Sequence, residues 1–127
     1  MKSFSVGTDM VEIARIKRSC RLESFVRKVY SRQERDLFSL KKDPYSSMAG
    51  NWAAKEAFSK SLGTGVRGFE LSEVSILRDE LGCPYMVLSG KAAQIAQERE
   101  LDFSVSISHE KEYATAVVIA FRRDKNE

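Results

Sequence analysis

Apolar and polar residues alternate in several short stretches of the chain. The alternation is clearest in residues 3–10, where Phe4, Val6 and Met10 share one parity. A period of two is typical of a β-strand with one face toward a core. A turn at residues 79–82 separates two further stretches and predicts a hairpin. The predicted strands are residues 3–10, 71–77, 84–88, 103–108 and 113–121.

Helical spacing is found mainly in the first half of the chain. Ser31 and Glu34 have the spacing of a capping box, which opens a helix by satisfying its free amide groups. The strongest helix signal covers residues 45–62, where alanines and long side chains favour a helix that Gly63 ends. The other predicted helices cover residues 11–20, 25–29 and 89–99.

The order of these elements lacks a regular β-α-β rhythm, which favours the α+β class. A length of 127 residues fits one compact domain, so we expect residues 1–127 to fold as a single unit. The charged tail after about residue 122 is expected to fray. No apolar run approaches the ~20 residues of a membrane span, and residues 1–6 do not read as a signal peptide. We therefore expect a cytoplasmic protein that does not enter a membrane.

Charge is distributed unevenly along a chain whose net charge is only +3. Residues 12–42 contain ten Lys and Arg against four acids. Such a basic segment predicts an acidic partner surface or a phosphate-rich ligand. Cys20 and Cys83 lack metal-site spacing, so both are expected to be free thiols.

Two carboxylates stand out as candidates for chemistry. Asp9 comes near the end of a predicted strand, where it either projects into a cleft or caps the following helix. Glu56 and Lys60 are four residues apart, which suits either a surface ion pair or a half-buried site. Because Met48 and Trp52 continue the same spacing toward the N-terminus, the half-buried site is slightly favoured.

These residue types favour some chemistries and argue against others. Two separate carboxylates suit magnesium, which takes one or two of them together with waters and phosphates. His109 is the only histidine and has no cysteine pair nearby, so a zinc site is not expected. The glycines at 63 and 65 follow a predicted helix rather than precede one, unlike a phosphate-binding Walker loop.

Four segments resemble the holo-acyl-carrier-protein synthase family of the 4′-phosphopantetheinyl transferase superfamily. They are residues 6–15 (VGTDMVEIAR), 52–65 (WAAKEAFSKSLGTG) and 105–114 (VSISHEKEYA), together with a Gly-x-Pro-Tyr turn at 82–85. Their order and spacing agree with the family over nearly the whole chain, and the segment at 52–65 is the most specific of them.

The resemblance implies a fold, an assembly and a reaction. It implies an α+β protein with a small antiparallel sheet, assembled as a homotrimer with active sites at the subunit interfaces. The enzyme would use Mg²⁺ to transfer 4′-phosphopantetheine from coenzyme A to a serine of an acidic apo-acyl carrier protein. Adenosine 3′,5′-bisphosphate would be released, and the product would serve fatty acid biosynthesis. A metal-bound water or a carboxylate such as Asp9 would accept the serine proton.

The resemblance also assigns roles to individual residues. Asp9 and Glu56 would hold the magnesium, and Lys60 would contact the diphosphate beside them. The same three residues are the predicted catalytic set. Coenzyme A would be bound by Lys55, Lys60, Gly63, Pro84 and His109, and the carrier protein by Arg15, Arg18 and Arg21.

Two positions depart from the family pattern. Many members carry arginine at the position of Asn51 and threonine at that of Glu110, and both positions tend to approach the phosphates of coenzyme A. Losing a cation and gaining an anion would weaken phosphate binding unless Lys55, Lys111 or another subunit compensates.

Two alternative functions remain open at this stage. The first is a nucleic-acid-binding module that uses the basic segment 12–42, which would show steeply salt-dependent binding to DNA. The segment lacks the interleaved aromatic residues that stack on bases, which argues against that function. The second is a non-catalytic regulator that binds coenzyme A without transferring any group.

Overall fold

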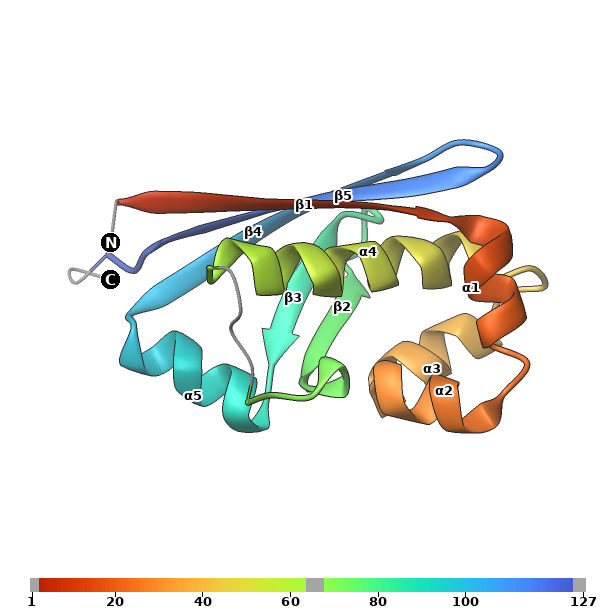
Figure 1. Ribbon diagram of the computed structural model, residues 1–127, viewed down its shortest axis with the longest axis horizontal. Coiled ribbons are helices and arrows are strands. Elements are labelled where there is room, and N and C mark those ends of the chain that lie inside the picture. The colour runs from red at the N-terminus through yellow and green to blue at the C-terminus, as the bar shows by residue number, and fades with distance from the viewer. Residues whose placement is uncertain (1–2, 64–67, 125–127) are drawn as a thin grey trace.

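A computed structural model describes residues 3–63 and 68–124 (Figure 1). Strands frame the chain at both ends, and a long central helix lies between them (Figure 1). The elements in chain order are β1 (Phe4–Glu12), α1 (Ile13–Ser19), α2 (Glu23–Val29), α3 (Arg32–Ser39), α4 (Tyr45–Ser61), the 3₁₀ turn η1 (Leu71–Glu73), β2 (Val74–Arg78), β3 (Pro84–Leu88), α5 (Gly90–Glu98), β4 (Leu101–His109) and β5 (Tyr113–Arg122).

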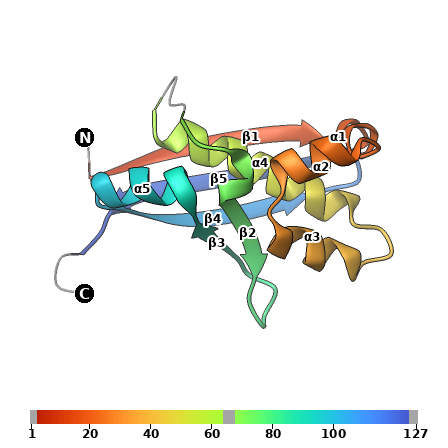
Figure 2. The ribbon, with the colours of Figure 1, turned by 90° about the horizontal axis from the view of Figure 1, so that it is seen from below.

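The strands form two small antiparallel sheets. β1, β5 and β4 pair in that order, and β2 and β3 form a separate hairpin. α4 lies along one face of the three-stranded sheet, whereas α1, α2 and α3 gather at one end of the molecule and α5 at the other (Figures 1 and 2). The predicted α+β class with a small antiparallel sheet is confirmed.

The sheet face toward α4 is built from small side chains, which lets the helix approach closely. Gly7 is buried on β1, and a Cβ atom there would collide with the carbonyl oxygen of Ala57 and lie 2.6 Å from the amide nitrogen of Ser61. The inward positions of β5 are likewise mostly alanine, at 114, 116 and 120. Backbone therefore packs almost directly on backbone where β1 crosses α4.

The opposite sheet face carries the large apolar side chains, and it is exposed. On β1 the side chains of Phe4 and Met10 are 60% and 65% exposed. The register places Phe4 beside Phe121 of β5 and Val6 beside Ile119. The sheet is thus apolar on both faces, but helix covers only one of them.

The local sequence signals predicted most element boundaries correctly. The capping box is present, because the Ser31 hydroxyl accepts from the Glu34 amide and the Glu34 carboxylate accepts from the Ser31 amide. The strand predicted for 71–77 was wrong over its first three residues. These form η1, where Glu73 accepts a hydrogen bond of 2.8 Å from the amide of Glu70.

The ends of two predicted elements are only partly described. Gly63 follows α4 with a φ of 113°, as expected of a helix-ending glycine, whereas Gly65 lies outside the described residues. In the tail, the amide of Arg123 donates to the carbonyl of Glu100 over 2.8 Å, and residues 125–127 are not described. Over residues 3–63 and 68–124, no helix combines the length and the apolar character needed to cross a membrane.

Candidate active site

β1 and α4 bring two of the predicted residues into contact. The odd-numbered residues of β1 face α4, so the Asp9 carboxylate points toward the helix rather than to the open face. The Lys60 ammonium donates to Asp9 Oδ1 over 3.2 Å and to the Thr8 carbonyl over 3.0 Å. The Asp9 side chain is 18% exposed and that of Lys60 is 56% exposed. A ligand in solution can therefore reach both groups.

Glu56 lies on α4 one turn before Lys60, on the same side of the helix. Exposure increases along this stripe, because Met48 is buried, Trp52 and Glu56 are half-buried, and Lys60 is exposed. This gradient supports the half-buried site over a solvated surface pair. The alternative role of Asp9 as a helix cap is wrong, because Glu12 occupies the cap position of α1.

The donors at this site suit a hard cation that keeps much of its own hydration. The Asp9 carboxylate has the Lys60 ammonium beside it, and Glu56 carries a second carboxylate one helical turn before Lys60. Within the described ranges no three His, Cys, Asp or Glu side chains cluster as a metal cage would require. Magnesium commonly takes only one or two protein carboxylates and fills its shell with waters and substrate phosphates. The arrangement fits that mode.

Lys55 occupies an unexpected place in the interior. Its ammonium is fully buried and contacts Glu34 Oε1 over 2.6 Å, together with the carbonyls of Leu71 and Val74. Burial lowers the pKa of Lys55, and the charge and hydrogen bond of Glu34 partly oppose that effect. The cofactor-binding role predicted for Lys55 gains no support, because its ammonium is enclosed and already paired.

Asn51 belongs to the same buried group. Its Nδ2 donates to Glu34 Oε2 over 2.8 Å and to the Ile76 carbonyl over 3.0 Å. Its Oδ1 accepts a 3.0 Å hydrogen bond from Arg78. We call Glu34, Asn51 and Lys55 the buried triad. Of the roles of these three residues, the sequence analysis predicted only the capping role of Glu34.

Two of the other predicted cofactor residues, Pro84 and His109, lie on strands other than the one that carries Asp9. Pro84 begins β3 opposite Arg78, and His109 ends β4 opposite Ala114. β5 separates β4 from β1, so His109 and Asp9 are on different edges of the sheet. Glu110 accepts hydrogen bonds of 2.7 Å from the amides of residues 112 and 113, so its carboxylate stabilises the β4–β5 turn.

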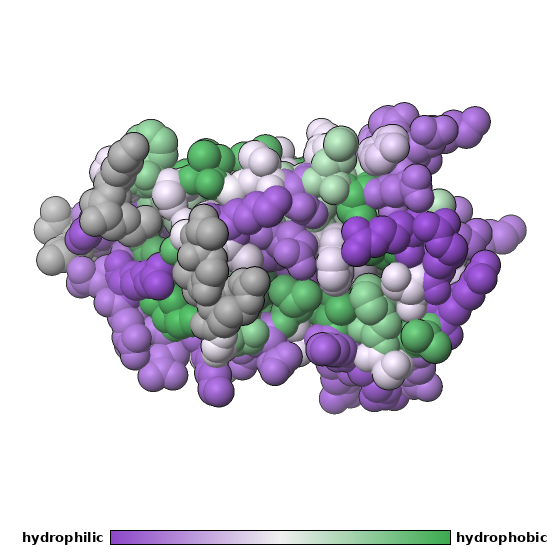
Figure 3. All heavy atoms as spheres, in the orientation of Figure 1, coloured by the Kyte–Doolittle hydropathy of each residue, from purple (hydrophilic) through white to green (hydrophobic). Residues whose placement is uncertain are grey.

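The three arginines predicted to bind a partner lie on α1 and the turn that follows it. Arg15 is exposed and stacks over Trp52, with 5.9 Å between its guanidinium carbon and the ring centroid. Arg18 is paired with Glu12 over 3.6 Å, and Arg21 is exposed. Hydrophilic side chains predominate at this end of the molecule, around a smaller group of hydrophobic ones (Figure 3).

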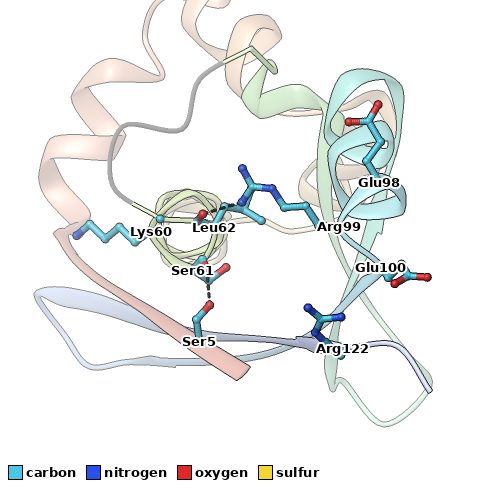
Figure 4. A pocket seen from close by; sticks show the side chains of 9 residues that line it. Ser5, Lys60, Ser61, Leu62, Glu98, Arg99, Glu100 and Arg122 are labelled. Carbon is cyan, nitrogen blue, oxygen red and sulfur yellow. Dashed lines mark hydrogen bonds between the residues drawn. The ribbon is translucent and has the colours of Figure 1, made fainter. Parts of the chain in front are cut away.

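A polar groove lies beside the C-terminal end of α4 (Figure 4). Arg99 caps this end of the helix by donating to the Leu62 carbonyl over 2.8 Å, and the Ser5 hydroxyl donates to the Ser61 carbonyl. The Lys60 side chain extends to the opposite side of the helix from Arg99 (Figure 4). The groove therefore borders the Asp9 site and shares Lys60 with it, whereas Asp9 and Glu56 do not line it.

Comparison with known proteins places this arrangement in a family. The family model described as the 4′-phosphopantetheinyl transferase superfamily matches residues 5–118, so the chain belongs to that superfamily. A holo-[acyl-carrier-protein] synthase from Caldanaerobacter subterraneus is 42% identical over 91% of this chain and 92% of the relative. One from Clostridium beijerinckii is 44% identical over 90% and 94%.

Solved structures agree with the sequence relatives. The synthase from Neisseria meningitidis superposes with a TM-score of 0.85 at 30% identity, covering 93% of this chain and 98% of that one. The ACPS–CoA complex from Chronobacterium ammoniagenes gives 0.84 at 29% identity, covering 97% and 100%. The predicted enzyme class, holo-[acyl-carrier-protein] synthase, is confirmed by these relatives.

Proposed function

We propose that this protein transfers 4′-phosphopantetheine from coenzyme A to a serine of apo-acyl carrier protein. The reaction would depend on magnesium, release adenosine 3′,5′-bisphosphate and serve fatty acid biosynthesis in the cytoplasm. The observation that carries this proposal is the contact between Lys60 and Asp9, with Glu56 on the same side of α4. The names of the relatives and the structure of one of them with CoA support the choice of substrates.

In this proposal Asp9 and Glu56 hold Mg²⁺ between β1 and α4. When bound, the ion neutralises charge on the diphosphate at which the bond breaks. Phosphoryl transfer requires the protein mainly to position the reacting groups and to balance their negative charge. The two carboxylates are carried on a strand and a helix that pack backbone against backbone, so their relative position is well defined.

Lys60 has the reach and exposure needed to contact the leaving bisphosphate. Its ammonium is held by Asp9 and by the Thr8 carbonyl. A lysine is a point charge on a flexible stem, so it can exchange a carboxylate partner for a phosphate oxygen. Gly63, directly after α4, would border the cofactor there, and Pro84 and His109 would contribute from elsewhere.

We propose that three copies assemble and that each active site lies at a subunit boundary. Two features support the assembly. The sheet face away from α4 exposes more large apolar side chains than a monomer usually leaves in water. In addition, His109 lies on the opposite edge of the sheet from Asp9 and Pro84 lies in the separate hairpin, so in this proposal a neighbouring copy supplies both to the Asp9 site.

The basic end of the molecule would receive the acidic carrier protein. Arg15 and Arg21 are exposed there, and the Arg18–Glu12 pair is exposed enough to exchange partners. Complementary charge would speed encounter and orient the carrier protein before transfer. Trp52 would connect the two regions, because it lies on α4 between the arginines and Glu56.

The transfer itself is tested by mass spectrometry. Apo-acyl carrier protein mixed with this protein, coenzyme A and Mg²⁺ is expected to gain the mass of one phosphopantetheine. A carrier protein whose acceptor serine is alanine should gain nothing, and EDTA should stop the reaction. Binding of coenzyme A without any mass gain would contradict the proposal and favour a regulatory role.

The assembly is tested by placing a charge on the exposed apolar face. Val6→Asp is expected to convert a trimer into a monomer and to lower transfer by at least about tenfold, because a buried unpaired carboxylate at an interface is strongly unfavourable. Sedimentation equilibrium measures the mass, and circular dichroism checks the fold. Gln97→Asp adds the same charge on the exposed side of α5. It should change neither the sedimenting mass nor the transfer rate. A fully active parent that sediments as a monomer would refute the trimer.

A further inference from the structure

α4 has no single apolar face that would fix its rotation about its own axis. Its buried residues cover every side except the one that carries Trp52, Glu56 and Lys60, and five of them are alanine or glycine at 49, 50, 53, 54 and 57. Small, similar side chains specify one packing arrangement weakly, because one alanine fits where another did. The close contacts at Gly7 and Gly50 set how near the helix approaches the sheet. They leave its rotation to other groups.

The buried triad can fix the rotation of α4, because its hydrogen bonds are directional and the packing of these small side chains is not. Asn51 and Lys55 are one turn apart on α4, and both bond to the carboxylate of Glu34 on α3. Carbonyls of β2 and of the segment before it accept the remaining hydrogen bonds, at Ile76, Leu71 and Val74. Among the described residues, no buried side-chain nitrogen or oxygen lacks a partner. Any rotation of α4 would break several of these bonds at once.

The orientation of the Asn51–Lys55 face determines where Glu56 and Lys60 point. Glu56 is the residue after Lys55, so its side chain points roughly 100° further around the axis. Lys60 lies one turn beyond Glu56 on the same side. A rotation that freed the triad would therefore turn both groups away from Asp9.

We propose that Glu34 is a positioning residue which, through Asn51 and Lys55, sets the rotation of α4 and thereby aims Glu56 and Lys60 at Asp9. The effect on transfer rests on the proposed function, but the rotation itself does not. Replacing a whole buried charge pair by apolar residues of similar size is often tolerated in stability. Stability and helix orientation are therefore separable by mutation.

The test uses the double variant Glu34→Met/Lys55→Met and the only tryptophan of the chain, Trp52, as a reporter on α4. With 5-fluorotryptophan incorporated, fluorine NMR of the parent should show one sharp resonance. The double variant should melt below the parent, because the Ser31 amide and the carbonyls of Leu71 and Val74 lose their side-chain partners, but it should still unfold in one cooperative transition. Its resonance should broaden or split, and kcat should fall roughly 10–100-fold, as misplacement of catalytic groups predicts.

Phe58→Leu is the matched control, because Phe58 is also buried on α4 but packs on the rings of Phe69 and Phe103 and makes no hydrogen bond to Glu34. It should lower the melting temperature yet keep one resonance and most of kcat. A double variant with one sharp resonance at the parent position overturns the proposal, whatever its kcat.

If the double variant does not fold, Glu34→Asp replaces it, since it keeps the charge but shortens the side chain. A shifted or split resonance supports the proposal, and an unchanged spectrum overturns it. The fluorine spectra do not depend on catalysis. A parent that is inactive in the transfer assay would therefore contradict the proposed function and leave the inference about the rotation of α4 unaffected.

Discussion

Replacing Asp9 by asparagine is expected to lower kcat for phosphopantetheine transfer by about 10²–10³-fold, the loss typical of removing one preorganised electrostatic group. Asparagine keeps the shape of the side chain but removes the negative charge that a divalent cation requires. The same size of loss is expected for Glu56→Gln. Because both carboxylates serve one ion, the double variant should be little worse than either single one.

The measurement is initial rate against magnesium concentration, with carrier protein and coenzyme A saturating. Both variants should also need more magnesium for half-maximal rate. Asp102→Asn is the matched control, because Asp102 is an exposed carboxylate that pairs with Arg123 over 3.4 Å at the opposite end of the sheet. It should transfer at the parent rate. If Asp9→Asn and Glu56→Gln each kept more than half of the parent kcat, the metal site would be elsewhere.

Replacing Glu34 by glutamine is expected to lower the free energy of unfolding by about 3–5 kcal/mol, as for other buried ion pairs that lose one partner. The substitution leaves the Lys55 ammonium in the interior without an opposing charge. Glutamine fills the same volume, so the loss measures the charge and not a cavity. Urea denaturation at neutral pH in EDTA measures it.

This loss should become smaller as the pH rises. Burial already lowers the pKa of Lys55 below its ordinary value of 10.5, and Glu34 opposes that effect. Without Glu34 the pKa of Lys55 in the folded state falls further. The Lys55 ammonium of the folded variant therefore loses its proton at a pH where the same group in the unfolded chain still holds it. Stability rises with pH wherever the unfolded state binds more protons. The gap between variant and parent should therefore narrow between neutral pH and about 10.

Glu23→Gln provides the comparison for this experiment. Glu23 pairs with Arg27 over 3.1 Å, but both side chains are exposed. Its replacement should cost at most about 1 kcal/mol, with no comparable narrowing of the gap at high pH. If the difference in free energy of unfolding between the parent and Glu34→Gln stayed constant or widened with pH, the unpaired charge of Lys55 would not be the cause of the destabilisation.

Local signals in the sequence predicted the fold well, because strands, turns and helix caps are specified by neighbouring residues. The capping box at Ser31 and the hairpin turn before Pro84 formed as expected. η1 was missed because the Glu70–Glu73 cap competes with a weak alternation over the same residues. Its polar contacts favour a turn over an extended chain.

The candidate site was less accessible to sequence reasoning, because its residues meet through tertiary contacts. Asp9 and Lys60 are far apart in the chain, and only the resemblance joined them before the structure did. Lys55 was predicted to bind coenzyme A, because nothing in the sequence indicates that it pairs with Glu34 of another helix. One signal was available: Asn51 and Lys55 share a helix face within a run of alanines, where a solvated lysine is out of place.

The close packing at Gly7 bears on how damaging variants of this enzyme are interpreted. Ala57 and Ser61, which lie against Gly7, directly follow Glu56 and Lys60 along α4. Even a methyl group at position 7 would wedge the helix outward and widen the gap to Asp9, two residues further along β1. A screen for inactive clones would then return a residue that bears no functional group, alongside the acids and the lysine. The loss of activity in such a variant would come from a wrong distance between the backbones of β1 and α4. No reagent added to the assay would restore the activity.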